Sequence, residues 1–281
     1  MQYIYAVILG LVQGIAEFLP ISSSGHLALF ETLFHSEDIA LLDNSPLFNV
    51  LLHLATLVAV ILAYRRDVGE LLGEFFRMVG GWICPRRVAR EKNIPVRRLI
   101  GYLILATLPL FVFVLVSDFI EGLSLYPVAV GAALIVTGVI LFIADRLPAG
   151  HKNAETMTWR DALFIGIAQG FATVPGLSRS GTTISAGMGC RLERSFAVKF
   201  SFLMSLLSVL GAVCLKVLDV AQTGIDTAVL PVYLTGMVVA GVTGYFSICL
   251  LRRLVDKGRF GGFAYYCWAV GALSVVLALV L

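Results

Sequence analysis

The chain has 281 residues, of which 59% are hydrophobic and only 14% are charged, and its mean hydropathy is +0.92. This composition excludes an ordinary water-soluble domain, in which about a quarter of the residues are charged. The formal net charge of +3 comes from basic residues gathered in short segments between apolar ones, so we expect a lipid bilayer and no nucleic acid as partner.

Apolar segments long enough to cross a bilayer, which takes about 20 helical residues, recur along the chain. Two further apolar segments, 1–34 and 161–190, are interrupted by Pro, Gly and Ser. We therefore expect an all-α integral membrane protein with six transmembrane helices and two broken segments. The predicted transmembrane helices cover residues 46–64, 99–117, 123–144, 196–218, 228–251 and 260–281.

The two broken segments are copies of one motif. Residues 10–25 read GLVQGIAEFLPISSSG, and residues 166–181 read GIAQGFATVPGLSRSG. The single membrane domain, 1–281, therefore divides into repeat one, 1–148, and repeat two, 149–281. Seven pairs are identical at an offset of 156 positions: Gly10/Gly166, Gln13/Gln169, Gly14/Gly170, Ala16/Ala172, Ser22/Ser178, Ser24/Ser180 and Gly25/Gly181.

Basic residues predict the orientation of these segments. They gather in 65–98, 145–160 and 191–199, whereas the acidic segments 118–122 and 219–227 contain no Lys or Arg. The basic segments are therefore expected to be cytoplasmic. A fourth basic group between the last two spans belongs with them: Arg252, Arg253, Lys257 and Arg259.

Segment 161–190 lies between two predicted cytoplasmic segments, so it must enter the membrane and return on the same side. We expect a re-entrant helix hairpin that is broken at Pro175 and Gly176. The copy in 1–34, broken at Pro20, is expected to enter from the outer side, which makes the two repeats inverted. Irregular backbone inside a membrane must be buried in protein or line a wet cavity, so the two broken tips should meet near the midplane.

The first tip carries residue types that catalysis needs. Glu17 follows Gln13 by one helical turn, which places both side chains on one helix face. A carboxylate inside a membrane costs roughly 2.5–3.5 kcal/mol to insert, so Glu17 is expected to have a partner. Glu17 could form a structural hydrogen bond to a neighbouring helix. We favour a functional role, in which Glu17 binds a metal ion or acts as a general base. The same short segment continues with Ser22, Ser23, Ser24 and His26.

The second tip suits a phosphate group. Arg179 is the only Arg outside the predicted cytoplasmic segments. A guanidinium beside hydroxyls and helix N-termini can hold a phosphate or diphosphate, and it could also pair with Glu17 before substrate binds. The hydroxyls around Arg179 belong to Ser178, Ser180 and Thr183.

The motifs QGIAEFLPISSSGH, residues 13–26, and PGLSRSGTT, residues 175–183, resemble the two signature motifs of the BacA/UppP family of undecaprenyl-diphosphate phosphatases. The resemblance implies that the chain converts undecaprenyl diphosphate to undecaprenyl phosphate, the lipid carrier of bacterial cell-wall synthesis. It also implies a place in the bacterial inner membrane, with an active site open to the outer, periplasmic side.

The resemblance assigns roles to individual residues. It implies a divalent cation, Mg²⁺ or Ca²⁺, held by Glu17 and the diphosphate oxygens, with Gln13 as a further ligand where many members of the family have Glu. The catalytic residues that it implies are Glu17, Ser23, His26 and Arg179. The diphosphate-binding residues that it implies are Ser22, Ser24, Ser178, Arg179, Ser180 and Thr183.

The sequence leaves several alternatives open. The nucleophile is His26, Ser23 or a water molecule. A polyprenyl-phosphate transporter or flippase would also use inverted repeats with broken helices. A type 2 phosphatidic acid phosphatase is disfavoured, because Ser185 stands where that family needs a second His. A purely structural protein would have no need for charged residues at both breaks. The oligomeric state is also open, because helix faces of small residues could pack within one chain or form a homodimer.

Overall fold

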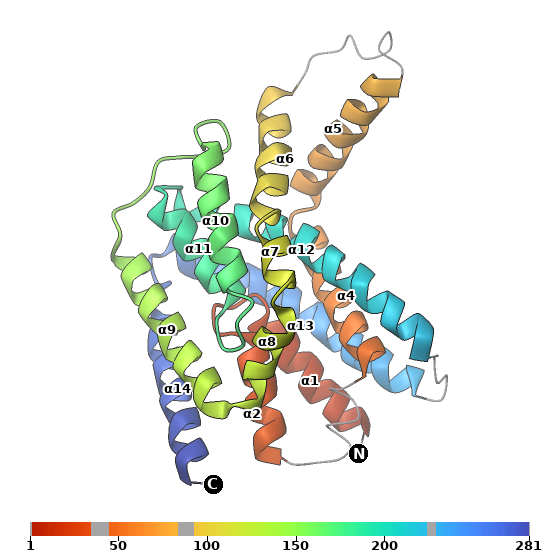
Figure 1. Ribbon diagram of the computed structural model, residues 1–281. Coiled ribbons are helices and arrows are strands. Elements are labelled where there is room, and N and C mark those ends of the chain that lie inside the picture. Colours follow the sequence, from red (N-terminus) through yellow and green to blue (C-terminus); the bar gives the residue numbers. More distant parts are fainter. Residues whose placement is uncertain (1, 35–44, 84–92, 224–228, 281) are drawn as a thin grey trace.

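The computed structural model describes residues 2–34, 45–83, 93–223 and 229–280, and Figure 1 shows these ranges folded as packed helices. Parts of the predicted basic segment 65–98 and of the acidic segment 219–227 lie outside the described residues. The elements are α1 (Gln2–Ala16), α2 (Ser23–Phe34), α4 (Pro46–Ala63), α5 (Arg65–Ile83), α6 (Ile94–Thr107), α7 (Leu110–Val114), α8 (Ser117–Gly122), η2 (Leu123–Leu125), α9 (Pro127–Arg146), α10 (Trp159–Phe171), α11 (Arg179–Gly189), α12 (Arg194–Thr223), α13 (Leu230–Asp256) and α14 (Gly262–Val280).

Several of these helices are long and apolar enough to cross a membrane. Within the described ranges they are Ile94–Val114, which joins α6 and α7, together with α9, α12 as far as Cys214, α13 and α14. Each of the five overlaps a predicted transmembrane helix, so the protein is a multi-pass membrane protein.

The remaining predicted span, 46–64, corresponds to α4. This helix reaches spanning length only together with α5, across a bend of 93°. The sequence did not predict α5 as a helix, because charged residues such as Arg66, Glu70 and Arg77 break its apolar pattern. The described residues therefore contain five helices that could cross the membrane, or six if the bent pair counts as one span, and the predicted number of six stays a prediction.

The two broken segments fold as helix–turn–helix pairs, as the sequence predicted. Helix α1 ends at Ala16 and α2 begins at Ser23, while α10 ends at Phe171 and α11 begins at Arg179. Pro lacks the backbone N–H that a helix needs, and Pro20 and Pro175 both lie in the turns. In the second turn Gly176 has φ +93°, a conformation that residues with a side chain rarely adopt.

Each turn is held by a helix from another part of the chain. The Thr137 hydroxyl on α9 donates to the Gly176 carbonyl at 3.1 Å and accepts the Ser178 amide at 3.1 Å. On α14, the Cys267 thiol donates to the Pro20 carbonyl at 3.5 Å. These bonds satisfy backbone groups that the broken helices leave unpaired, as burial requires.

The two turns meet, although they lie 156 positions apart in the sequence. The Ser180 hydroxyl donates to the Leu19 carbonyl at 3.4 Å, and a Cβ added at Gly181 would lie 3.1 Å from Pro20. In Figure 1 the pair α10 and α11 reaches the contact from above, and α1 and α2 reach it from below. The structure thus confirms that the broken tips come together.

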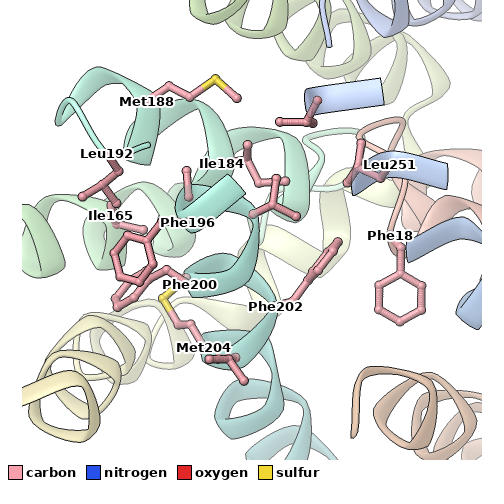
Figure 2. Packing of buried hydrophobic residues seen from close by; sticks show 14 of the residues in the cluster. Phe18, Ile165, Ile184, Met188, Leu192, Phe196, Phe200, Phe202, Met204 and Leu251 are labelled. Carbon is pink, nitrogen blue, oxygen red and sulfur yellow. The ribbon is translucent and has the colours of Figure 1, made fainter. Parts of the chain in front are cut away.

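A buried apolar core lies between the second helix pair, α12 and the first turn (Figure 2). Phe202 of α12 meets Phe18 of the first turn edge to face, with ring centroids 5.5 Å apart. Phe18 directly follows Glu17, so this packing places the carboxylate beside the second turn.

Candidate functional site

Glu17 stands at the centre of a hydrogen-bonded cluster between the two turns. Its Oε2 accepts bonds from the Ser23 hydroxyl at 2.9 Å and from the Gln13 amide nitrogen at 3.2 Å. Its Oε1 lies 3.7 Å from a guanidinium nitrogen of Arg179. The Glu17 side chain is 9% exposed, whereas that of Arg179 is 38% exposed. The carboxylate is therefore nearly buried and compensated, as its position requires.

The ion pair between Glu17 and Arg179 confirms one of the alternatives that the sequence left open. It joins the first turn to the first residue of α11. At 3.7 Å it is longer than a hydrogen bond, and Arg179 keeps part of its surface accessible. An anion that approaches from this surface can therefore reach the guanidinium.

The serines of the two turns form matching caps. The Ser22 hydroxyl accepts the Gly25 amide at 3.2 Å, and the Ser178 hydroxyl accepts the Gly181 amide at 3.1 Å. Such caps satisfy one of the free N–H groups at the start of a helix. The second serine of each turn lies beside the cap: Ser24 is 3.4 Å from Ser22, and Ser180 is 3.2 Å from Ser178, oxygen to oxygen.

Thr183 is buried and fixes the start of α11. Its hydroxyl lies 2.6 Å from the Ser201 hydroxyl of α12 and donates to the Arg179 carbonyl at 2.8 Å. Together with Glu17, Arg179 and Ser180, it lines a pocket about large enough for one water molecule. The sequence did not single out Ser201, because a lone Ser in an apolar span carries no signal.

The hydrogen bonds of His26 are made outside this cluster. Its Nδ1 lies 2.8 Å from the Ser22 carbonyl oxygen, and its Nε2 lies 2.7 Å from the Tyr266 hydroxyl of α14. The Glu17 carboxylate contacts Gln13, Ser23 and Arg179 instead. The three serines that follow Pro20 connect the two groups, so His26 and Glu17 lie on either side of one short turn.

The side chains near Glu17 fit a divalent cation only if substrate shares it. In the described part of the chain, no three His, Cys, Asp or Glu side chains converge on one point. Glu17 supplies one carboxylate and Ser23 one hydroxyl oxygen beside it, whereas Gln13 turns its amide nitrogen, which only donates, toward Glu17. That set suits Mg²⁺, which is commonly held by one or two carboxylates, water and substrate phosphates.

Buried charge, two helix N-termini and a shared polar pocket define a class: a multi-pass membrane protein with a polar site where two broken helices meet. Comparison with known proteins agrees with this class. The model of the family "Bacitracin resistance protein BacA" matches residues 6–273. The chain therefore belongs to the BacA family, which the two motifs resembled.

Relatives of this family are similar over their full length. A protein named undecaprenyl-diphosphatase from Methanobrevibacter smithii is 38% identical over 275 residues, which cover 97% of this chain and 96% of the relative. One from Carboxydothermus hydrogenoformans with the same name is 35% identical over 280 residues, or 99% of this chain and 98% of the relative. One from Syntrophotalea carbinolica, again with the same name, is 37% identical over 279 residues, which cover 99% of this chain and 100% of the relative.

Proposed function

We propose that this protein is a membrane phosphatase that hydrolyses undecaprenyl diphosphate to undecaprenyl phosphate and inorganic phosphate. The observation that carries the proposal is the meeting of Glu17, Ser23 and Arg179 at two helix breaks in a chain of the BacA family. The reaction returns a lipid carrier to bacterial cell-wall synthesis, and relatives over the full length bear the name of this activity.

The proposal includes two inverted repeats, 1–148 and 149–281, with 1–34 and 161–190 as re-entrant hairpins. Paired close approaches support it. A Cβ added at Gly10 would lie 2.5 Å from the Gly236 carbonyl oxygen, and one added at the equivalent Gly166 would lie 2.3 Å from that of Ala106. Each hairpin thus packs on the second span of the other repeat, which is the exchange that a twofold relation produces.

Orientation follows from the basic segments. With these in the cytoplasm of the bacterial inner membrane, the first hairpin enters from the outer side, and the site opens there. The prenyl tail of the substrate lies among the spans in contact with lipid, while the diphosphate reaches the two turns.

Arg179 and the helix N-termini bind the diphosphate. A guanidinium can grip phosphate oxygens through two parallel bonds, and the starts of α2 and α11 direct positive dipole ends toward the turns. The substrate's negative charge competes with Glu17 for Arg179, so the ion pair opens as substrate enters. Ser24 and Ser180, whose hydroxyls lie beside the caps, add hydrogen bonds to the same oxygens.

Glu17, with Gln13 nearby, is the proposed place for the divalent cation, Mg²⁺ or Ca²⁺. When bound, the cation supplies neutralising charge to the diphosphate. Glu17 also keeps the Ser23 hydroxyl oriented, because its Oε2 accepts that bond at 2.9 Å.

Ser23 is the nucleophile that the geometry supports best. Its hydroxyl is hydrogen-bonded to a carboxylate, the arrangement of a nucleophile and its base. Oγ attacks the terminal phosphorus as its proton passes to Glu17, and undecaprenyl phosphate leaves. Water then attacks the phosphorus of the phosphoserine, phosphate leaves, and Glu17 returns its proton to Oγ of Ser23. His26, whose Nδ1 bonds to the Ser22 carbonyl oxygen and leaves Nε2 as the acceptor, takes the proton of that water.

The experiment is phosphate release from undecaprenyl diphosphate by the purified protein in detergent, with and without EDTA. We expect release that EDTA abolishes and that added Mg²⁺ or Ca²⁺ restores. Acid-stable phosphate on the protein is expected after brief incubation with substrate labelled in its terminal phosphate, and its absence in Ser23→Ala identifies the nucleophile. A folded protein that binds the lipid but releases no phosphate contradicts the proposed function.

A polyprenyl-phosphate transporter is the second candidate, and one observation favours it. A cavity of about 740 Å³ lies where the α4–α5 bend meets α12 and α13, and Tyr64, Lys199 and Arg252 line it. Phe202 packs on Tyr64, with ring centroids 6.1 Å apart, and also on Phe18 beside Glu17. A transporter would move labelled undecaprenyl phosphate across the membrane of a vesicle without releasing phosphate. A phosphatase would release phosphate from undecaprenyl diphosphate in detergent.

A further inference from the structure

Tyr266 reaches the first turn from the last helix of the chain. Its hydroxyl lies 2.7 Å from Nε2 of His26, 240 positions away in the sequence. The two rings are almost parallel, at an angle of 6°, with centroids 5.6 Å apart. Hydrogen bond and stacking together leave the imidazole little freedom to rotate.

The contacts of His26 determine which ring nitrogen carries the proton. Nδ1 lies 2.8 Å from the Ser22 carbonyl oxygen, which can only accept a hydrogen bond, so Nδ1 is the protonated nitrogen. In a neutral imidazole Nε2 then has a lone pair and accepts the bond from the Tyr266 hydroxyl. His26 can therefore take up a proton at Nε2.

The position of the Tyr266 hydroxyl is set by neighbours on α14. The next residue, Cys267, is buried and bonds to the Pro20 carbonyl in the same turn. Trp268 donates to the Ile135 carbonyl of α9 at 3.2 Å. These two bonds tie α14 to the first turn on one side and to α9 on the other, so the hydroxyl meets His26 without depending on a flexible segment.

We propose that Tyr266 is a positioning residue for His26. It keeps Nε2 as a proton acceptor and limits rotation of the imidazole ring. The inference rests on the proposed function, in which His26 accepts a proton from water. Tyr266 is 44% exposed, so its hydroxyl can turn away from the imidazole when substrate arrives and leave Nε2 free for that proton.

Tyr266→Phe removes only the hydroxyl and keeps the stacked ring. We expect kcat to fall roughly tenfold or more, while KM changes less than twofold, because the diphosphate is bound by other residues. The matched control is Tyr265→Phe: Tyr265 is 61% exposed and packs on Phe142 and Trp268, so kcat should stay unchanged. A Tyr266→Phe protein with full kcat would overturn the proposal.

A spectroscopic measurement separates this inference from the proposed function. Histidine ¹⁵N resonances distinguish the two neutral tautomers, and the His26 signals can be assigned as those missing in His26→Ala among the 4 histidines of the chain. We expect the Nδ1-protonated tautomer in the wild type and a shifted Nε2 resonance in Tyr266→Phe.

This spectrum needs no turnover, so it tests the contact even if the wild type proves inactive. The opposite tautomer in the wild type, or an Nε2 resonance that is identical in Tyr266→Phe, would overturn the positioning role. A wild type without phosphate release but with the expected spectrum would contradict only the enzymatic proposal.

Discussion

At the first helix break Ser22 caps the Gly25 amide, and at the second break Ser178 caps the Gly181 amide in the same way. Around these equivalent caps the charged side chains differ. The first break carries Glu17, and the second carries Arg179, which pairs with it. Duplication has thus provided two similar helix starts, while divergence has given them opposite charges. Neither half holds both charges, so the site requires the two halves together.

The largest effect is expected when the charge of the first break is removed. Glu17→Gln keeps the shape but loses the base for Ser23 and the anionic ligand for a cation. We expect the rate of phosphate release to fall about 10³-fold, as measured by initial rates in detergent. Glu70→Gln, at an exposed position on α5, is the control that should keep the wild-type rate. A loss of less than tenfold in Glu17→Gln would contradict the role.

The second break is tested by Arg179→Lys, which keeps the positive charge and removes the planar guanidinium. We expect the rate to fall about 10²-fold, since an ammonium cannot grip two phosphate oxygens in parallel. Arg98→Lys, exposed at the start of α6, is the matched control. Equal activity of Arg179→Lys and the wild type would show that the charge alone matters.

The breaks also differ in how their turns are built, and Gly176→Ala sharpens this difference. Gly176 has φ +93°, and an added Cβ would lie 2.4 Å from the Val130 carbonyl oxygen. We expect a loss of about 1–3 kcal/mol in stability, seen as a lower midpoint of thermal unfolding in detergent. Gly189→Ala, with no atom within 4 Å of the added Cβ, should leave the midpoint nearly unchanged. A similar midpoint for both variants would contradict the strain argument.

The smallest effects concern the caps. Ser22→Ala and Ser178→Ala should each lower stability by about 1 kcal/mol, again measured by thermal unfolding. Substitution by glycine should affect the two positions differently, because Ser22 has φ +69° and Ser178 has φ −77°. Ser22→Gly relieves an unfavourable conformation and should cost less than Ser178→Gly. The reverse order would show that the two caps are not conformationally different.

Much of this comparison was predictable from the sequence. Pro20, Pro175 and Gly176 marked the breaks, since Pro interrupts a helix beyond its first turn and Gly weakens one. The repeated motif then predicted that the two turns meet, and an isolated Arg and an isolated Glu in apolar segments made the ion pair one of the alternatives. These predictions rest on local rules and on the high energy of unpaired charge in a membrane.

Other features of the site could not be predicted. Tyr266 follows Tyr265 in an apolar span, and no spacing shows which of the two hydroxyls meets His26. That contact depends on how α14 packs against a turn 240 positions away. Helix α5 was missed for a different reason: its many charged residues are typical of a loop. Only the structure shows that Glu74 of α5 is buried and paired with Arg97 of α6.

The central claim, that the two breaks form one site, is tested most directly by a double-mutant cycle. Glu17→Asp and Arg179→Lys are mild enough to leave measurable phosphate release, alone and together. If the two side chains act as a unit on the diphosphate, the double variant should lose clearly less than the product of the two single losses. Losses that multiply would mean that Glu17 and Arg179 act independently, and the shared site would be contradicted.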